Sequence, residues 1–423
     1  MKIRPVIRLT GEIDIPGDKS ISHRAIMLGS LAKGETRIKG VQDSDDCNYT
    51  AAAFSQMGIE IEKRGEITAV KGKGLKGLQK PAVELHVGNS GTTMRILAGI
   101  LAGQDFEVTL TADESLSRRP MKRIVEPLSL MGVDIKARDG EYPPLTVKGG
   151  PVKAVNYKMP VSSAQVKSAI LFAGLYSEGT TRVTEEFRSR DHTERMMEYF
   201  GADIDIDGTR VSVTGGKELA SRYVEVPGDI SSASFFIAAA TLLQGSKLMI
   251  KKVGMNPTRS CFIDILARMG AHIAVMNKKA LFEPVADIEV ESAKTSGTVI
   301  EKGEIPGIID ELPALFVVAS LSEGRTVIEG AGELRVKETD RIRSMQENLS
   351  AMGARFSGEG DNIIIDGVKE LKPSIIKAYG DHRTCMSMAV AALAARGESE
   401  IDDVACVGKS FPGFFRTLEE LKQ

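Results

Sequence analysis

The feature that most constrains the fold is a unit that recurs six times along the 423-residue chain. Each copy reads as a helix entered through polar residues, a strand, a second helix and a closing pair of alternating strands. The plainest echo joins Pro16-Gly17-Asp18 to Pro227-Gly228-Asp229, an interval of 211 residues (227 − 16). One such unit cannot bury its own sheet, so the copies are expected to assemble around shared cores.

Three copies in each half predict an α/β (α+β) chain of two similar domains. The expected boundaries are residues 1–16 plus 228–423 for one domain and 17–227 for the other, with hinges at 16–18 and 227–229. The first strand precedes the first Pro-Gly turn, so it is expected to belong with the C-terminal half. A single open α/β sheet is the alternative, although the G-x-G-x-x-G turn of a dinucleotide fold is absent from the sequence.

Composition describes an ordinary globular protein. Hydrophobic residues make up 42%, charged residues 26%, and the net charge is −2, without the basic excess typical of a nucleic-acid coat. No apolar run reaches the ~20 residues of a membrane helix, and no signal or transit segment precedes the first strand. Four scattered cysteines without a C-x-x-C pair indicate neither zinc nor a disulfide framework. We therefore expect a cytoplasmic protein with reduced thiols.

Polar and cationic residues gather where the repeated units begin their first helices. In the first copy Lys19, Ser20 and Arg24 surround the opening turn, where free N–H groups and the helix dipole favour an anion. One such start is more often simply solvated, but several that converge would suit a substrate with several negative charges. The fourth start, at Asp229, has no cation and reads as structural. The other starts carry Asn89/Gly91/Thr92, Ser163/Gln165/Lys167, His382/Arg383 and, as an acidic exception, Asp310/Glu311.

The second dense group of charges is Leu334–Arg343. If the segment were one helix, Lys337 and Arg341 would be like charges four residues apart. Such a pair costs ~0.2–0.5 kcal/mol unless an anion lies between them. The alternative is a solvated face with a Glu338–Arg341 pair. Arg118-Arg119 before Pro120, and Lys409, are weak signals by themselves, and the five histidines show no metal-ligand spacing.

Four motifs in order give the chain a specific resemblance along essentially its whole length. They are Pro16–Arg24, Gly88–Arg95, Arg335–Arg341 and Gly380–Arg383. The chain resembles the 5-enolpyruvylshikimate 3-phosphate synthase (3-phosphoshikimate 1-carboxyvinyltransferase) family. That resemblance implies two domains of three βαβαββ repeats each, the inside-out barrel of enolpyruvyl transferases. It also implies transfer of the enolpyruvyl group of phosphoenolpyruvate to the 5-hydroxyl of shikimate 3-phosphate, with release of phosphate, in aromatic amino-acid biosynthesis.

The resemblance also assigns binding residues. Those implied for shikimate 3-phosphate are Lys19, Ser20, Arg24, Ser163, Gln165, Arg190, Asp310 and Lys337. Those implied for phosphoenolpyruvate are Lys19, Asn89, Gly91, Arg119, Gln165, Arg341, Arg383 and Lys409.

Three residues carry the implied chemistry. The methylene carbon of phosphoenolpyruvate must gain a proton while the attacking hydroxyl loses one. By resemblance Glu338 is the acid and Asp310 the base, and Lys19 shares the proton traffic. Arginine and lysine neutralise the substrate anions, so no metal or cofactor is expected. The partners are small molecules only, and the family leads us to expect a monomer.

Two departures distinguish this chain within the family. Ala164 stands where well-studied members have serine, and Arg190 is expected to supply a phosphate contact instead. The segments Arg190–Glu194, Ser163–Lys167 and Asn256–Arg259 resemble the family's second subclass, often tolerant of the inhibitor glyphosate. Gly91 leaves room beside the phosphoenolpyruvate site, which argues against reading tolerance from these motifs.

Two other functions compete with this interpretation. The sister enolpyruvyl transferase acting on UDP-N-acetylglucosamine usually has a cysteine just before an Arg-Pro pair, whereas Asp113–Pro120 has none. An RNA-end-processing repeat protein would show a basic stripe or stacking aromatics, against a −2 charge and 5% aromatics. A catalytically dead scaffold is disfavoured because every expected acid and base position is filled.

Overall fold

The first helix shows how the repeats begin. In the computed structural model, which describes residues 1–280 and 282–422, helix α1 (Lys19–Leu31) starts where the Asp18 carboxylate accepts the N–H of Ile21 at 2.9 Å. Such a cap satisfies one of the free N–H groups of the first turn. Eleven of the 13 residues of α1 are buried, so the helix is a core element.

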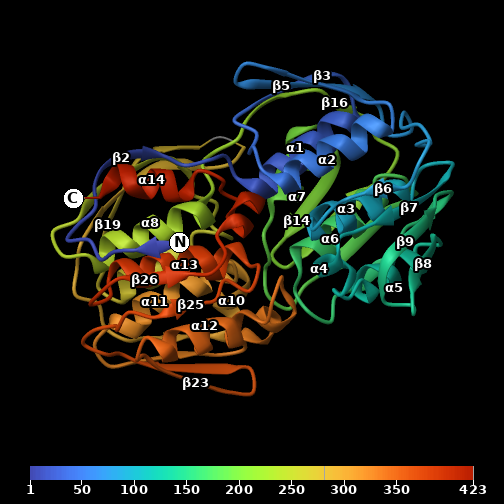
Figure 1. Cartoon of the computed structure of the whole chain (residues 1–423). Helices are drawn as coiled ribbons and strands as arrows, with labels where there is room; N and C mark the ends of the chain where they lie inside the picture. The colour runs from blue at the N-terminus through green and yellow to red at the C-terminus, as the bar shows by residue number, and fades with distance from the viewer. Residues whose placement is uncertain (281, 423) are drawn as a thin grey trace. The chain divides into compact units, whose positions relative to one another are not determined.

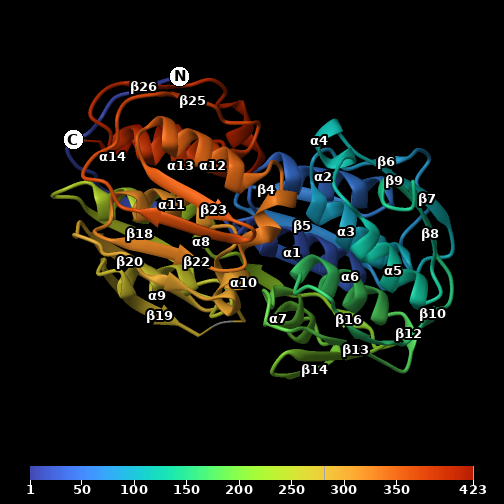
Figure 2. The same ribbon diagram turned by 90° about the horizontal axis from the view of Figure 1, so that it is seen from below.

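The chain divides into two compact units. One consists of Gly17–Val226, here called the inserted unit, and the other of Met1–Pro16 with Pro227–Gln423, here called the split unit. Pro227 lies in the split unit, one residue from the boundary drawn from the sequence. The ribbon of each unit is drawn in Figures 1 and 2.

The inserted unit contains three repeats. The first has α1, β3 (Ala32–Lys39), α2 (Asp45–Gln56), β4 (Glu60–Arg64) and β5 (Ile67–Lys73). The second has β6 (Leu85–His86), α3 (Gly91–Leu101), β7 (Glu107–Thr111), α4 (Glu114–Ser117), α5 (Lys122–Leu130), β8 (Asp134–Arg138) and β9 (Tyr142–Lys148). The third has β10 (Val152–Lys153), β11 (Asn156–Lys158), α6 (Ala164–Gly174), β12 (Ser177–Glu178), β13 (Thr180–Thr184), α7 (His192–Tyr199), β14 (Asp203–Asp207) and β15 (Arg210–Thr214), followed by β16 (Leu219–Ala220) and β17 (Tyr223–Glu225).

The split unit begins with β1 (Lys2–Ile3) and β2 (Thr10–Asp14). Its fourth repeat has α8 (Ile230–Leu242), β18 (Lys247–Gly254), α9 (Cys261–Arg268), β19 (His272–Lys279) and β20 (Val285–Glu291). The fifth has β21 (Val299–Ile300), η1 (Lys302–Glu304), α10 (Ile305–Ile308), α11 (Leu312–Leu321), β22 (Arg325–Ile328), η2 (Ala331–Val336), α12 (Arg341–Ala351), β23 (Arg355–Glu359) and β24 (Asn362–Asp366). The sixth has β25 (Ile375–Ile376), α13 (His382–Leu393), β26 (Ser399–Ile401), η3 (Ala405–Lys409) and α14 (Phe414–Leu421).

The sheets repeat one topology. The orders β6-β7-β9-β8, β11-β13-β15-β14, β21-β22-β24-β23 and β2-β18-β20-β19 all place a leading strand parallel to the strand after the first helix, with an antiparallel hairpin beyond it. In the first repeat β16 and β17 take the position of the leading strand and pair in parallel with β3. The sixth sheet is β1-β26-β25, with β1 antiparallel where other repeats have a hairpin strand. The predicted repeat architecture is therefore confirmed.

Each core forms around three central helices. In the split unit these are α8, α11 and α13 (labelled in Figure 1), and nearly all of their residues are buried. The rings of Phe236 and Phe414 meet at 5.4 Å between centroids. In the inserted unit the central helices are α1, α3 and α6. A Cβ at Gly99 of α3 would lie 2.1 Å from the carbonyl oxygen of Ala169 of α6, so glycine permits this close helix packing. The outer helices, such as α9, are buried on one face only.

The chain passes between the units at Pro16–Gly17 and at Val226–Pro227. Within the split unit the N–H of Asp229 donates to the carbonyl of Pro16 at 2.9 Å. Within the inserted unit a Cβ at Gly17 would lie 1.9 Å from the carbonyl oxygen of Gly40, so glycine is required there. The two passages are therefore neighbours.

Candidate active site

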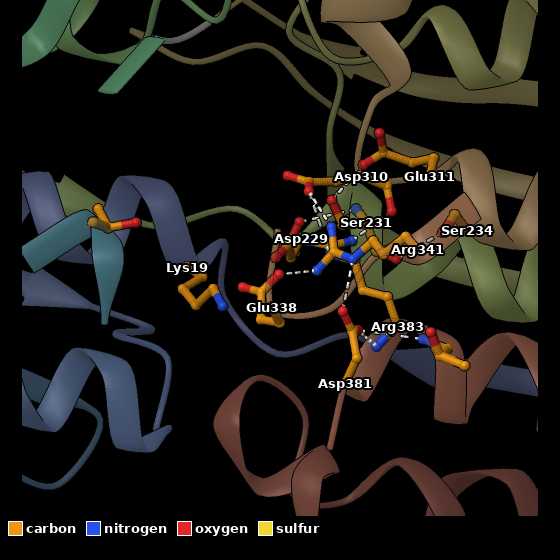
Figure 3. Close-up of polar contacts among 12 residues, drawn as sticks. Lys19, Asp229, Ser231, Ser234, Asp310, Glu311, Glu338, Arg341, Asp381 and Arg383 are labelled. Carbon is orange, nitrogen blue, oxygen red and sulfur yellow. Dashed lines mark hydrogen bonds and ion pairs between the residues drawn. The ribbon is translucent and has the colours of Figure 1, made fainter. Parts of the chain in front are cut away.

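Arg341 is the centre of a charged cluster in the split unit. It is the first residue of α12, and its side chain is 1% exposed. Nε donates to Asp381 Oδ2 at 2.8 Å, Nη1 donates to Asp310 Oδ1 at 3.2 Å, and Nη2 donates to Glu338 Oε2 (Figure 3). Each of the three guanidinium nitrogens thus donates to a different carboxylate.

The charge of Arg341 is fixed by this arrangement. Burial opposes a positive charge, but the carboxylates of Asp381, Glu338 and Asp310 outweigh it and raise the pKa of Arg341. The guanidinium is therefore a permanent cation in a dry setting. Asp310 and Glu338 remain 14% and 21% exposed, so both acids reach solvent from this anchor.

A second arginine holds Asp310 from the start of α13. Asp381 caps this helix, with Oδ1 accepting the N–H of Arg383 at 2.8 Å. The Arg383 side chain then donates through Nη1 to the backbone carbonyl of Asp310 at 2.8 Å, and its Nε lies 3.5 Å from Asp310 Oδ1. The starts of α12 and α13 therefore converge on one carboxylate, and the Nζ of Lys409 donates to the carbonyl of Gly380 beside them at 2.9 Å.

Lys337 and Arg341 do not lie on one helix. Lys337 follows the short helix η2, Glu338 lies in a bend, and α12 begins only at Arg341. The reason is Asp340, whose carboxylate accepts the N–H of Arg343 at 3.0 Å and so caps a new helix. The Glu338–Arg341 pair exists, but Arg341 is buried, so the segment is not a solvated face.

In the inserted unit Lys19 pairs with an acid that sequence reasoning missed. Its Nζ lies 3.1 Å from Oδ2 of Asp46, in the first turn of α2, and both side chains are largely buried. Asp46 is 27 residues from Lys19, and no motif marked it. It holds the lysine in place at the start of α1.

Arg24 ties three helices together. Its Nη1 donates to the carbonyl of Ser20 at 2.9 Å, its Nε to Thr193 Oγ1 at 2.6 Å, and its Nη2 to Ser168 Oγ at 2.8 Å. These contacts join α1 to the starts of α6 and α7. Arg24 thus has a scaffold role that the sequence did not predict, and its substrate contact stays a prediction.

The starts of α3 and α6 are joined through Gln165. Arg95 Nη1 donates to Gln165 Oε1 at 2.7 Å, and Gln165 Nε2 donates to Thr92 Oγ1 at 2.9 Å. A Cβ at Gly91 would lie 2.7 Å from Arg95 Nη1 and 3.4 Å from Arg119 Nη1. The room at Gly91 is therefore bounded by two arginines. Arg95 stands four residues after Gly91, a helical interval that was available as a signal.

Asn89 braces the segment that carries Arg119. Its Nδ2 donates to Asp113 Oδ2 at 3.0 Å, and its Oδ1 accepts the N–H of Leu116 at 3.2 Å. Both ends of the amide therefore contact α4 and its N-terminal flank. Ser163 takes the N-cap position of α6, but its side chain makes no capping bond.

Comparisons with known proteins decide the family. A profile of the family "EPSP synthase (3-phosphoshikimate 1-carboxyvinyltransferase)" matches residues 3–418. A 3-phosphoshikimate 1-carboxyvinyltransferase of Geobacter metallireducens is 49% identical over 421 residues, covering 99% of this chain and 98% of the relative. One from Brevibacillus brevis is 47% identical over 425 residues and covers 100% of both. The chain belongs to the EPSP synthase family.

The fold agrees with this family. A solved EPSP synthase of Acinetobacter baumannii superposes with a TM-score of 0.88 at 41% identity, covering 100% of this chain and 98% of that one. The predicted two-domain α/β fold and the predicted transferase class are confirmed. The UDP-N-acetylglucosamine and RNA-processing alternatives are not favoured by these matches.

The described residues include no helix with the length and apolarity needed to cross a bilayer. Within the same residues no group of three or more His, Cys, Asp or Glu is arranged to hold a metal ion.

Two of the segments that resemble the second subclass, Ser163–Lys167 and Arg190–Glu194, contribute to a buried ion cluster at α6 and α7 of this EPSP synthase family member. Lys167 Nζ lies 2.7 Å from Glu185 and 2.6 Å from Glu194, and all three side chains are 1% exposed. Burial lowers the pKa of Lys167, but the two carboxylates more than offset this, and the net pKa is raised. Burial raises the pKa of Glu194 against the pull of Lys167. Glu185 also accepts the N–H of Ser189 at 3.2 Å, which fixes the residue before Arg190.

Replacing Lys167 with methionine is expected to lower the free energy of unfolding by about 3–5 kcal/mol, because it leaves two carboxylates buried without their cation. Urea unfolding followed by circular dichroism measures this. Lys122→Met, which breaks the exposed pair with Glu126, is the control and should change stability by less than ~0.5 kcal/mol. Equal changes in the free energy of unfolding for the two variants would mean that the buried cluster contributes no more to stability than the exposed pair.

A buried histidine gives the protein a pH dependence. His23 Nδ1 is 2.6 Å from Thr50 Oγ1 inside the inserted unit. Burial, followed by the charges of Lys19 and Arg24, holds the pKa of His23 well below 6.5. Below pH ~6.5 the unfolded chain therefore binds a proton that the folded chain does not bind. In that range the free energy of unfolding decreases as the pH is lowered, by up to ~1.4 kcal/mol per pH unit.

We expect His23→Gln to remove this slope between pH about 5.5 and 6.5 and to leave the slope above pH about 7.5 unchanged. Urea unfolding of both proteins at several pH values measures it. An imidazole NMR signal of His23 that titrates near pH 6.5 would contradict the expectation.

Proposed function

We propose that the chain catalyses enolpyruvyl transfer from phosphoenolpyruvate to the 5-hydroxyl of shikimate 3-phosphate, with release of phosphate. The observation that carries this most directly is the pair of accessible carboxylates, Asp310 and Glu338, on one buried guanidinium. The reaction needs one proton donor and one acceptor beside a fixed cation. The name of the matched family, 3-phosphoshikimate 1-carboxyvinyltransferase, describes the same transfer.

In the proposed reaction Glu338 gives a proton to the methylene carbon of phosphoenolpyruvate. The 5-hydroxyl oxygen attacks the adjacent carbon, and Asp310 takes the hydroxyl proton. In the second half of the reaction the Glu338 carboxylate takes back one proton of the new methyl group, the bond between carbon and the phosphate oxygen breaks, and the departing phosphate receives the proton held by Asp310. The double bond and both carboxyl groups are thereby restored. Lys19, held by Asp46, supports the developing charge from the inserted unit.

The contact between Glu338 and Arg341 couples the proposed acid to the proposed phosphoenolpyruvate site. A substrate anion that binds Arg341 takes the place of Glu338 as the partner of its Nη2. Glu338 then lies next to the bound substrate, where the proposed proton transfer takes place.

The binding residues proposed in the split unit are Asp310, Lys337, Arg341, Arg383 and Lys409. Those proposed in the inserted unit are Lys19, Ser20, Arg24, Asn89, Gly91, Arg119, Ser163, Gln165 and Arg190. We propose a cytoplasmic monomer that uses no cofactor; light scattering would then give a mass near 45.6 kDa.

Phosphate release tests the function. It should depend on both phosphoenolpyruvate and shikimate 3-phosphate, and UDP-N-acetylglucosamine should not replace the latter. Phosphate release with UDP-N-acetylglucosamine alone as acceptor would assign the chain to the sister reaction.

Substrate binding is proposed to draw the two units together about residues 16–18 and 227–229, because residues of both contribute to binding. Within their own units Lys19 already pairs with Asp46, and Arg341 contacts three carboxylates. Repulsion between these two cations therefore does not explain an open state, and closure is proposed to depend on the bound substrates.

We expect the radius of gyration in solution to fall when shikimate 3-phosphate is added, and small-angle scattering measures it. The chain passes between the units only at Pro16–Gly17 and at Val226–Pro227. Such a narrow connection permits rigid-body motion of one unit against the other. An unchanged radius with both substrates present would remove closure from the mechanism.

A further inference from the structure

The subclass motif Asn256–Arg259 lies outside the residues assigned to substrate. Arg259 is 2% exposed and reaches the start of α8, which the sequence alone left without a cation. Its Nη2 donates to Ser231 Oγ at 2.5 Å and to Glu311 Oε1 at 3.1 Å, and lies 3.6 Å from Asp229 Oδ1. Arg259 therefore joins the N-termini of α8 and α11.

Glu311 is the residue next to the proposed base. It occupies the N-cap position of α11, its side chain is 1% exposed, and Ser231 Oγ also donates to it. Its N–H donates to the carbonyl of Ile308 at 2.8 Å. Asp310, one residue earlier, has its carbonyl held by Arg383. The backbone that presents Asp310 is thus fixed by Arg383 on one side and by the Glu311 side chain on the other (Figure 3).

Arg259 is itself held rigidly. Its N–H donates to the carbonyl of Asn256 at 2.8 Å, while the Asn256 side chain accepts the N–H of Thr258 at 2.9 Å and donates to Glu283 at 2.9 Å. Because these hydrogen bonds hold the turn, the Arg259 side chain extends from a fixed backbone. Asn256 and Thr258 therefore help to fix the position of Arg259.

We propose that Arg259 is a positioning residue for Asp310. By holding Glu311 against the start of α8, it fixes the turn that aims the Asp310 carboxylate at Arg341 and at the substrate hydroxyl. The proposal rests on the proposed role of Asp310 as the base. A misplacement of about 1 Å at a reacting group can cost ~10²-fold in rate, even when its cause is remote.

Arg259→Lys tests the idea, because lysine keeps the charge but its ammonium ends one bond short of Nη2, the nitrogen that contacts both Ser231 and Glu311. We expect kcat to fall about 10- to 100-fold while the KM values of both substrates change less than about threefold. The matched control is Arg268→Lys in the nearby α9, whose fork contacts the half-buried Glu304 at 3.0 and 3.1 Å. It should leave both constants unchanged. Normal kcat in Arg259→Lys would overturn the proposal.

A double-variant cycle separates positioning from general loss of structure. In an Asp310→Asn background, Arg259→Lys should cost little more, since the carboxylate it aims is gone. Multiplicative losses would show that Arg259 acts by another route and would also overturn the proposal.

Two further results are distinguishable. If Arg259→Lys does not fold, the nearly isosteric Glu311→Gln takes its place, and a fall in kcat with unchanged Tm supports the proposal, whereas full activity overturns it. If Asp310→Asn alone stays active, the assignment of Asp310 as base is wrong. The link between Arg259 and catalysis, if kcat still falls, must then run through another group.

Discussion

Asp310→Asn and Glu338→Gln are each expected to lower kcat by ~10²–10⁴-fold, the usual contribution of a general acid or base. Each change keeps the shape of the side chain and removes its ability to exchange a proton at neutral pH. Asp310 and Glu338 also both contact the buried Arg341, so each variant leaves that cation with two carboxylates instead of three. Folding should therefore survive.

Steady-state kinetics with calorimetry of shikimate 3-phosphate binding measure both effects. Binding should stay within about tenfold in each variant, because neither change removes a cation. Glu329→Gln on the exposed surface is the control. A variant that keeps near-normal kcat would exclude its residue from proton transfer, and equal losses of kcat and of binding would point to a role in holding substrate instead.

Arg341→Met is the second variant expected to have a large effect. It leaves Asp310, Glu338 and Asp381 close together without the cation that each contacts, and breaking a buried pair costs about 3–5 kcal/mol of stability. The variant also lacks the fork proposed to bind phosphoenolpyruvate. Loss of a buried charge pair of that kind typically costs ~2–5 kcal/mol of binding, which corresponds to roughly 30- to 5,000-fold in kcat/KM.

Arg341→Lys separates the two roles. It restores a positive charge and so should recover much of the stability, while the KM for phosphoenolpyruvate stays raised by about tenfold or more because lysine lacks the bidentate fork. Thermal unfolding and kinetics measure them independently. The control is Arg343→Met, two residues after Arg341, which breaks an exposed ion pair with Glu347. It should change neither the stability nor the KM for phosphoenolpyruvate. An Arg341→Lys enzyme with unchanged KM would show that phosphoenolpyruvate does not need the fork.

Much of the fold was predictable because repetition constrains it. The Pro-Gly-Asp echo between residues 16 and 227 marked both passages between the units, and the closing strand pair expected of each repeat does form a hairpin, as in β4 and β5. Whether one helix runs through both Lys337 and Arg341 was not predictable, because Asp340 caps a new helix. A capping residue inside a charged run competes with helix continuation, and periodicity alone does not reveal which wins.

The candidate site was predictable where residue types cluster along the sequence, as at Asp310, Glu338 and Arg341. The partners that hold those residues were not. Asp46, Arg95 and Arg259 come from other elements, and only the folded chain shows that they contact Lys19, Gln165 and Glu311. The net charge of a segment likewise failed to reveal that the cations already have carboxylates beside them.

The leading position of β2 in the sheet of β18 has a consequence for synthesis on the ribosome. The N–H of Leu9, just before β2, donates to the side chain of Ser246, 237 residues later. At about 5–20 residues per second, β2 of the nascent chain waits roughly 10–50 s for its partner. By then the whole inserted unit, Gly17–Val226, has left the ribosome and can complete its own sheets. Strand β2 is thus made before the inserted unit but takes its place in a sheet only after that unit can fold.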